Sequence, residues 1–520
     1  MTNGTSDRGQ AIAGRILGLL ESRGEARALE VFEAAGGALF AFRNGYPALG
    51  RLLDAFPGDL WRRRESVLGA LVFYLVKQGR AGRARSYLDA PEIEFRKTAL
   101  FDLYALMVEI HLGGPVSEER LAGWIALERR LPVSEPLLEG LYHNCMLVML
   151  VRLGRLKAAR EAGQRAISCY READHSYLEH FIHIHLADLG VVEGRLRSAR
   201  RSLAAAEHCL ERSGVLYANE RDLIEIIHLA IAYETGRLET IPDRAGALRA
   251  SLLRGDSWSE VFVQLGRISV MSAFFLSGPA RARQELEAFQ ADYARRHGTS
   301  SAALDILAVL IARLDWRRQE AEANLLALSA EPVQSAIGAV MNVEARVALG
   351  HAGPDPAALP GPRGAIVMAL HEAEAATGAE RRRKVERALW LAVDEGQTAP
   401  FLEHRDVFAG LGARLASGRF ARGHRPLARM TARILRAVEQ SYVIPPDLAA
   451  RGVTLRQYRV LSALQGGATN KQIARELGIS EATVKYHLSA LYRGLEFANR
   501  KQLIDSLPEN EVFTESWPLS

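Results

Sequence analysis

Glycine recurs at nearly constant intervals along much of the chain. Each of these glycines is followed by a basic or polar residue and then by a segment rich in small residues; they are Gly79, Gly154, Gly194, Gly236 and Gly278. The last three intervals are 40, 42 and 42 residues long. Apolar segments of helical length, such as FIHIHLADLGVVE, precede these glycines. The period predicts helical hairpins that stack in an array, because a single hairpin cannot bury its own apolar face.

Strand-like alternation is very scarce beside this repeat, so the sequence predicts an all-α fold. The pattern resembles tetratricopeptide repeats, although its period is longer than their usual ~34 residues. A later segment, 384–415, resembles the end of the solenoid in large MalT-like LuxR regulators. We therefore expect a tetratricopeptide-like sensor or interaction domain over residues 1–417, interrupted by a loop rich in proline and glycine at 350–364.

Two capped helices joined by a tight turn are predicted near the C-terminus, in the run TNKQIARELGISEATVKYHLSALYRGL. Thr469 and Gln472 form a capping box at the start of the first helix. Gly478 suits the left-handed residue that ends it, and Ser480 suits the N-cap of the second helix. Such a helical corner can present its second helix to the major groove of DNA.

Two further helices complete this unit. One begins at the capping box of Thr454 and Gln457, and another is expected over about 499–507. The block 455–507 resembles the LuxR-type DNA-binding domain, in the run NKQIARELGISEATVKYHLSALY and in the later ANR. The resemblance implies a four-helix DNA-binding domain over residues 447–507 whose fourth helix carries a dimer contact.

The same resemblance assigns roles to single residues. Three would read base edges: Lys485, Tyr486 and Ser489. Six would hold phosphates: Asn470, Lys471, Thr483, His487, Arg500 and Lys501. Tyr486 has the alternative of packing on a neighbouring helix, and His487 that of a packed residue. The chain departs from the family pattern at the end of the recognition helix, where Gly494 and Glu496 stand in place of the usual Lys and then Gly.

Positive charge is concentrated in the C-terminal part. The connector 418–446 holds six arginines and one acid, and 447–507 holds nine basic residues and five acids. The tail 508–520 is acidic, with three glutamates. This concentration of positive charge in one part of the chain favours binding to the phosphates of a nucleic acid. The alternative for this segment is that its arginines merely solvate the connector.

Other chemistry is thinly represented. The chain has no GxxxxGK[ST] motif, so we expect no ATP-dependent switch within it. It also has no recognisable set of catalytic residues, so we expect neither enzymatic activity nor a cofactor. Histidines cluster between His175 and His185, but no carboxylate or cysteine nearby completes a convincing ligand set in the sequence. We expect these histidines to pack or to line a groove rather than to bind metal. The three cysteines, Cys145, Cys169 and Cys209, form no CxxC and are expected to be buried.

The sequence shows neither a signal peptide nor an apolar run of the ~18 residues of a membrane helix, so we expect a cytoplasmic protein that does not contact the membrane. The combined features favour a transcription regulator whose solenoid senses a protein or small-molecule effector. Its expected partners are promoter DNA, a second copy of the chain and RNA polymerase. The alternative is a tetratricopeptide-like adaptor whose terminal domain contacts protein; it would form complexes insensitive to salt and prefer no DNA sequence.

Overall fold

The computed structural model describes residues 2–505, except positions 92, 113–115, 133–134, 215, 217–218, 255–258, 299, 329–332, 334, 352–358 and 409–410. Within these residues all regular secondary structure is helical, which confirms the predicted all-α class. The acidic tail 508–520 and the middle of the 350–364 loop lie outside the described residues. The division into domains at 417 and 446 stays a prediction.

The chain forms two compact units. Unit 1 comprises residues 1–189, 198–227 and 247–262, and unit 2 comprises 190–197, 228–246 and 263–520. The helices of unit 1 are α1 (Thr2–Glu21), α2 (Glu25–Ala34), α3 (Phe40–Asn44), α4 (Tyr46–Ala55), α5 (Leu60–Arg63), α6 (Glu65–Lys77), α7 (Ala81–Asp89), α8 (Ala99–Leu112), α9 (Glu118–Leu127), α10 (Pro136–Arg152) and α11 (Leu156–Glu172). Five helices contribute residues to both units: α12 (Ser176–Val192), α13 (Leu196–Ser213), α14 (Glu220–Glu234), α15 (Ile241–Arg254) and α16 (Ser259–Ser277).

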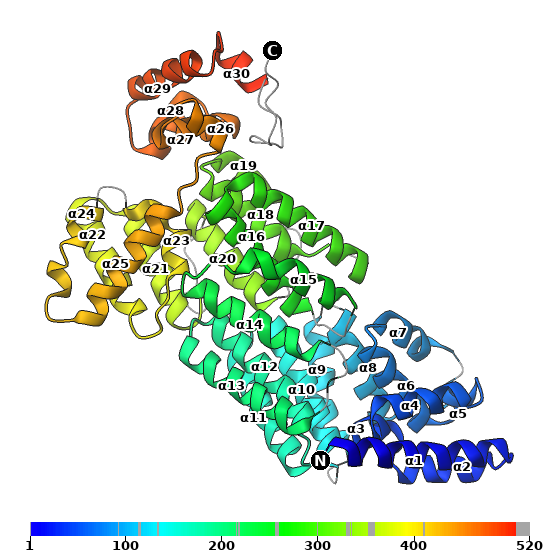
Figure 1. Ribbon diagram of the computed structural model, residues 1–520. Coiled ribbons are helices and arrows are strands. Elements are labelled where there is room, and N and C mark those ends of the chain that lie inside the picture. The colour runs from blue at the N-terminus through cyan, green and yellow to red at the C-terminus, as the bar shows by residue number, and fades with distance from the viewer. Residues whose placement is uncertain are drawn as a thin grey trace. The chain divides into compact units, whose positions relative to one another are not determined.

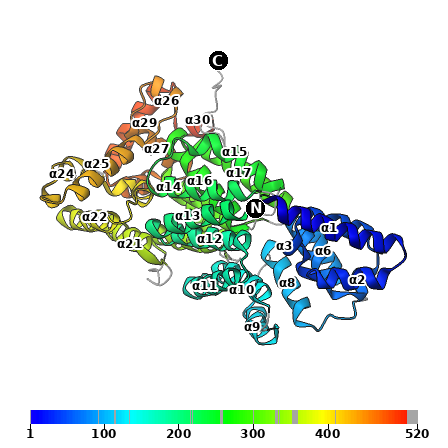
Figure 2. The same cartoon turned by 60° about the horizontal axis from the view of Figure 1, so that its bottom comes forward.

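Unit 2 continues the series of hairpins and ends in a small helical domain. Helix α18 packs against α17, α19 and α20, and α21 and α22 form another pair (Figures 1 and 2). The helices that belong to unit 2 alone are α17 (Pro279–His297), α18 (Ala302–Leu314), α19 (Arg318–Leu328), α20 (Ala336–Leu349), α21 (Gly361–Ala375), α22 (Gly378–Ala392), α23 (Ala399–Glu403), α24 (Gly412–Ala416), α25 (Arg425–Gln440), α26 (Pro446–Ala450), α27 (Leu455–Gln465), α28 (Asn470–Leu477), α29 (Glu481–Gly494) and α30 (Arg500–Asp505).

The repeated glycines end the first helix of their hairpins. At Gly154, φ is 69° and the backbone N–H donates to the carbonyl of Val151. The next N–H, of Arg155, donates to Leu150 at 2.8 Å. This pair of hydrogen bonds is a Schellman motif, which requires a left-handed residue and so favours glycine. Gly79, Gly194 and Gly236 repeat the geometry with φ between 70° and 76°.

A tryptophan takes the glycine's place in the turn between α18 and α19. Trp316 has φ of 58°, its N–H donates to Arg313, and the N–H of Arg317 donates to Ala312 at 2.8 Å. A bulky residue rarely adopts this backbone conformation, because its Cβ crowds the following carbonyl. The surrounding structure must therefore stabilise Trp316 in this turn.

A buried cluster of charges lies inside unit 2. Glu234 binds both Arg267, at 2.7 Å, and Arg363, at 2.8 Å, while Arg363 also pairs with Glu344 and Glu403. Three carboxyls thus share two guanidinium groups. Burial raises the pKa of Glu344, which favours its neutral form. Burial acts to raise the pKa of Glu403 as well, but the two arginines overcome it and hold that pKa at about 2.

One helix is as long as a membrane-spanning helix, although the sequence analysis found no apolar run of that length. Among the described residues, α16 alone is long and apolar enough to cross a membrane, with a mean hydropathy of 1.2. However, 94% of the segment is buried inside the protein, as in a core helix.

Candidate nucleic-acid interface

Helices α27 to α30 form a small domain, called here the reader domain (residues 455–505). Its core is built from the inner faces of all four helices. Both predicted capping boxes are present. In the first, the N–H of Gln457 donates to Oγ1 of Thr454, and the N–H of Thr454 donates to the Gln457 side chain at 2.8 Å. The buried core residues are Val460, Leu461, Leu464, Ile473, Val484, Leu488, Leu491, Leu495 and Leu503.

The turn between α28 and α29 fixes the direction of the second helix. Thr469 and Gln472 form the second capping box, with N–H to side-chain distances of 2.8 and 3.3 Å. Gly478 is left-handed with φ of 64°, as the sequence predicts. Ser480 accepts the N–H of Thr483 at 3.0 Å and so caps α29. These bonds hold α29 at a defined angle to α28.

The outer face of α29 carries the three residues predicted to read bases. Lys485 and Ser489 are exposed, and Tyr486 is 67% exposed. The ring of Tyr486 contacts the adjacent His487 edge-on, with ring centroids 5.6 Å apart. Its high exposure does not fit the alternative of packing on a neighbouring helix. The face offers one cation, one phenol and one hydroxyl, which are groups that suit base edges and the DNA backbone.

The residues predicted to hold phosphates fall into two groups. Lys471 and Lys501 are exposed. Arg500 instead donates to Oδ1 of Asn470 at 2.9 Å and to the carbonyl of Ala468 at 2.7 Å. Two of the predicted phosphate ligands are therefore bonded to each other, and Arg500 links α30 to the start of α28.

Thr483 and His487 lie deeper on α29. The hydroxyls of Thr483 and Ser480 are 2.8 Å apart. His487 is half-buried, and neither of its ring nitrogens has a hydrogen-bond partner within the described part of the chain. Burial lowers the pKa of His487, and Arg456 lowers it further. A lowered pKa disfavours the cationic form that a phosphate ligand would need.

The departure from the family pattern has a structural consequence at the end of α29. Glu496 is left-handed, with φ of 63°, and the N–H of Phe497 donates to Tyr492 at 2.8 Å. This is a Schellman end in which the glycine position is filled by a glutamate. The helix itself continues through Gly494.

The reader domain is attached to the turn that carries Trp316. The indole belongs to the reader core and meets the ring of Tyr458 edge-on, with centroids 6.1 Å apart. The hydroxyl of Tyr458 donates to Asp315 at 3.1 Å, and Arg317 donates to the side chain of Gln465 at 3.0 Å. Sequence reasoning missed this contact. Its one signal was a tryptophan 38 residues after Gly278, close to where the next glycine of the repeat would fall.

Arg405 reinforces the same attachment, with its guanidinium stacked over the tryptophan ring. Its guanidinium lies 5.3 Å from the ring centre of Trp316 and 4.3 Å from that of Tyr442. It also donates to the carbonyl of Leu314 at 3.0 Å and to that of Ser441. A buried cation between aromatic rings favours one fixed arrangement of the turn and of the segment that leads to α26.

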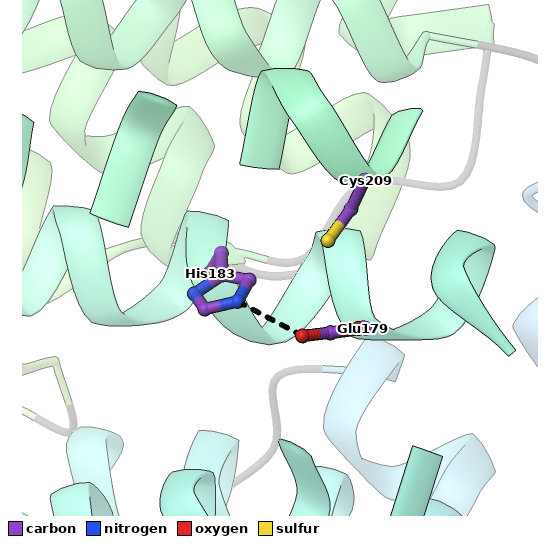
Figure 3. A group of neighbouring side chains, drawn as sticks. All are labelled: Glu179, His183 and Cys209. Carbon is purple, nitrogen blue, oxygen red and sulfur yellow. Dashed lines mark hydrogen bonds and ion pairs between the residues drawn. The ribbon is translucent and has the colours of Figure 1, made fainter. Parts of the chain in front are cut away.

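A candidate metal cluster lies apart from the reader domain, in unit 1. Figure 3 shows Glu179 and His183 on α12 facing Cys209 on α13, and their ligand atoms all lie within 4.8 Å of one another. A carboxylate and a cysteine thus lie beside one of the clustered histidines, His183. The sequence could not show it, because Cys209 comes from another helix.

The cluster is nevertheless satisfied without an ion. Arg171 binds Glu179 at 2.7 Å, and Nε2 of His183 lies 3.4 Å from the same carboxylate oxygen. Burial, together with the Glu179 carboxylate, raises the pKa of the Cys209 thiol to about 11. A metal ion would have to displace both the thiol proton and the guanidinium, so the cluster resembles a hydrogen-bonded core more than a ligand set.

Comparisons with known proteins converge on the reader domain. Residues 452–507 match the family model GerE, "Bacterial regulatory proteins, luxR family". The HTH-type transcriptional regulator MalT of Vibrio campbellii is 38% identical over 61 residues, which are 12% of this chain and 7% of that protein. The glycerol metabolism activator of Pseudomonas putida is 46% identical over 59 residues, 11% of this chain and 26% of that protein.

The sequence similarity to these relatives is confined to the C-terminal domain. The CsgBAC operon transcriptional regulatory protein of Escherichia coli (strain K12) is 41% identical over 58 residues, 11% of this chain and 27% of that protein. The chain thus spans about a quarter or less of the length of these relatives. A solved structure of a Rap protein complexed with competence and sporulation factor aligns over 74% of this chain and 98% of that one, with 11% identity and a TM-score of 0.43. The chain carries a C-terminal LuxR-type helix-turn-helix domain, of the kind found in MalT and other LuxR-family regulators, behind a long all-helical region.

Proposed function

We propose that the chain is a sequence-specific DNA-binding transcription regulator whose α29 enters the major groove. The observation that carries this proposal is the exposed outer face of a doubly capped helix-turn-helix within residues matched by the LuxR family model. Lys485 and Ser489 would contact base edges, and Tyr486 the bases or sugars beside them. Lys471 and Lys501 would hold the backbone.

Arg500 takes a positioning role in this proposal. Because its guanidinium is engaged by Asn470 and Ala468, it fixes α30 to the start of α28. The N-terminus of α28 then presents Asn470 and Lys471 to one phosphate segment. The fourth helix supplies the contact between two copies on DNA, and RNA polymerase is a further partner of the bound dimer.

The helical hairpins regulate this reader. An effector, either a protein or a small molecule, binds the hairpin array and shifts the reader toward the state that binds DNA, by the difference in its affinity for the two states. The exposed face of α29 and the buried attachment of α27 suggest that control acts through restraint of the whole domain rather than through a covered recognition helix.

The test is selection of genomic fragments by the purified full-length chain. We expect enrichment of a common motif, and its loss in Lys485→Glu. Lys157→Glu is the matched control, because Lys157 is an exposed lysine on α11 and the substitution changes the net charge equally. The proposal fails if no motif is enriched, or if both variants enrich the motif as the unsubstituted chain does.

A further inference from the structure

We propose that exposed arginines on α22, on α25 and in the turn before α25 form a second DNA-binding surface, which holds phosphates of the duplex beside the site of the reader domain. Helices α22 and α25 pack against each other in unit 2 (Figures 1 and 2). This arginine surface comprises six exposed residues: Arg383, Arg387, Arg419, Arg422, Arg425 and Arg429. The inference rests on the function proposed above, since a reader bound to DNA brings the flanking duplex close.

Helix α25 carries its arginines on a single face. Arg425, Arg429 and Arg436 fall within about 40° of one another around a helix of 3.6 residues per turn. The buried residues Leu427 and Ile434 fall on the opposite side. Arg425 and Arg429 are about 6 Å apart along the axis, close to the axial spacing of about 6.8 Å between alternate phosphates of one DNA strand. Neighbouring arginines of this face can therefore contact alternate phosphates.

The arginines of α22 continue the surface. Arg383 and Arg387 lie on the same face of α22 as Trp390, at helical spacings of four and three residues. Trp390 is 46% exposed, and its ring contacts that of His424, with centroids 4.8 Å apart. His424 is the N-cap of α25. The face of α22 that carries arginines therefore adjoins the start of α25.

The six arginines have no carboxylate partner. None of them forms an ion pair with a residue that the structure describes. The acids of α22 are bound to other cations, since Glu386 pairs with Arg382 at 3.5 Å and Glu380 pairs with Lys384 at 3.9 Å. The positive charge of the surface is thus left for a partner outside these residues.

The charge pattern of α25 opposes helix stability. Like charges four residues apart, such as Arg425 and Arg429, repel each other, whereas Arg318 on α19 has Glu322 at that position and binds it at 2.8 Å. Helix α25 also begins with a cation and has its one acid, Glu439, in the last turn, the reverse of what the helix dipole favours. Arginines that only solvated the helix would not need this pattern. Phosphates would supply the missing counter-charges.

DNA is within reach of these arginines when the reader is bound. Helix α25 has 16 residues and spans about 24 Å, and the segment 441–445 that follows it spans at most about 18 Å. This segment leads to α26, whose Leu448 packs in the reader core. The arginines of α25 therefore lie within about 12 base pairs of α26, at about 3.4 Å for each pair.

Fluorescence anisotropy titrations of duplex DNA with the full-length protein test the surface. The test variant combines four substitutions: Arg383→Gln, Arg387→Gln, Arg425→Gln and Arg429→Gln. We expect the slope of log affinity against log salt to fall by about 3 to 4 on preferred and scrambled duplexes alike, because each lost phosphate contact removes about 0.9 from it. The ratio of the two affinities should stay the same, since phosphate contacts carry no sequence information.

The control variant removes the same charge elsewhere. It replaces four exposed arginines of unit 1 that form no ion pair with a described residue, by Arg83→Gln, Arg129→Gln, Arg200→Gln and Arg201→Gln. Its slope should equal that of the unsubstituted chain. An equal fall in both variants overturns the proposal. An unchanged slope in the test variant also overturns it, and is the result expected if an acidic protein or the glutamates of the 508–520 tail occupy the surface instead.

Duplex length locates the contact. When about 12 base pairs are added beside the preferred motif, affinity should rise at least about 10-fold for the unsubstituted chain and for the control variant, but not for the test variant. An equal gain in all three proteins would place the flanking contact elsewhere and overturn the proposal. The test variant should melt no lower than the unsubstituted chain, because it removes like charges from α22 and α25. A lower melting temperature would contradict the charge argument.

Fragment selection separates this inference from the function on which it rests. If the slope falls in the test variant alone but no motif is enriched, the proposal of sequence-specific regulation fails, and the arginine surface stands as a phosphate contact. If a motif is enriched and lost in Lys485→Glu while the slope of the test variant is unchanged, the regulator proposal stands and the arginine surface fails.

Discussion

The hydroxyl of Tyr458, on the first helix of the reader domain, donates a hydrogen bond of 3.1 Å to Asp315, in the turn between α18 and α19. Both side chains are almost fully buried, and Asp315 is also paired with Arg283 at 3.1 Å. The tyrosine therefore donates to a buried carboxylate that also binds a guanidinium group. Burial and this carboxylate raise the pKa of Tyr458 well above its ordinary value, so the hydroxyl stays a donor throughout the physiological range.

Tyr458→Phe should weaken the attachment of the reader domain. It removes one charge-assisted hydrogen bond while Asp315 keeps its arginine partners, so we expect a loss of about 1–2 kcal/mol. Native-state hydrogen exchange of the α27 amides measures this opening free energy directly. Tyr492→Phe, in the same domain, is the control. Unchanged protection in Tyr458→Phe would mean that the bond does not hold the domain in solution.

Trp316→Gly has two opposing effects on stability, because it relieves the strain of the left-handed backbone but removes the buried indole. Glycine relieves the left-handed backbone by about 1–2 kcal/mol, but loss of the buried indole costs about 3–5 kcal/mol. The net effect should be release of the reader domain, seen as a larger radius of gyration in small-angle scattering. Asp174→Gly provides the comparison, because Asp174 is left-handed in the same kind of turn and its side chain is exposed. A Trp316→Gly protein that scatters as the unsubstituted chain does would show that packing of Trp316 is dispensable.

Substitution of Lys471 and of Lys485 should change DNA affinity in different ways, one through its salt dependence and the other through its sequence preference. Lys471→Ala should weaken preferred and scrambled DNA alike and lower the slope of log affinity against log salt by about 1. Lys485→Ala should cost about 1–3 kcal/mol on the preferred sequence and much less on the scrambled one. Fluorescence anisotropy titrations at several salt concentrations distinguish these outcomes. If Lys471→Ala lowered affinity only for the preferred sequence and Lys485→Ala lowered it for both sequences alike, the assignment of α29 as the base-reading helix would be refuted.

The reader domain was predictable in detail because its signals are local. The capping boxes of Thr454 and Thr469 and the glycine at 478 lie within three or four residues of the groups they satisfy, so spacing alone places them. The roles of its side chains toward DNA came from family resemblance and stay predictions. Even there, the bond between Arg500 and Asn470, 30 residues apart, was not visible in the spacing.

The attachment and the buried charges of unit 2 were not predictable. Arg363 reaches Glu234 across 129 positions of sequence, and Tyr458 reaches Asp315 across 143. Charged residues in amphipathic helices normally indicate a solvated face, and only three-dimensional packing reveals that these are buried and paired.

Glu476 should make the attachment of the reader domain dependent on pH. Burial raises the pKa of its carboxyl to about 7, with Asp406 and Glu322 acting in the same direction and Arg318 and Arg459 in the opposite one. A pKa raised by folding means that the neutral form is stabilised. This contribution is complete below the ordinary pKa of 4.5 and is lost as the pH rises through about 7.

Glu476→Gln keeps a neutral side chain at every pH. The melting temperatures of this variant and of the unsubstituted chain should therefore be similar at pH 5, and the variant should become the more stable as the pH rises from 5 to 8. Glu481→Gln, an exposed substitution at the start of α29, should show no such divergence. A difference between the two proteins that stays constant or shrinks with rising pH would contradict a half-buried carboxyl with a raised pKa at this position. It would also contradict the close fit of α28 against its surroundings in unit 2.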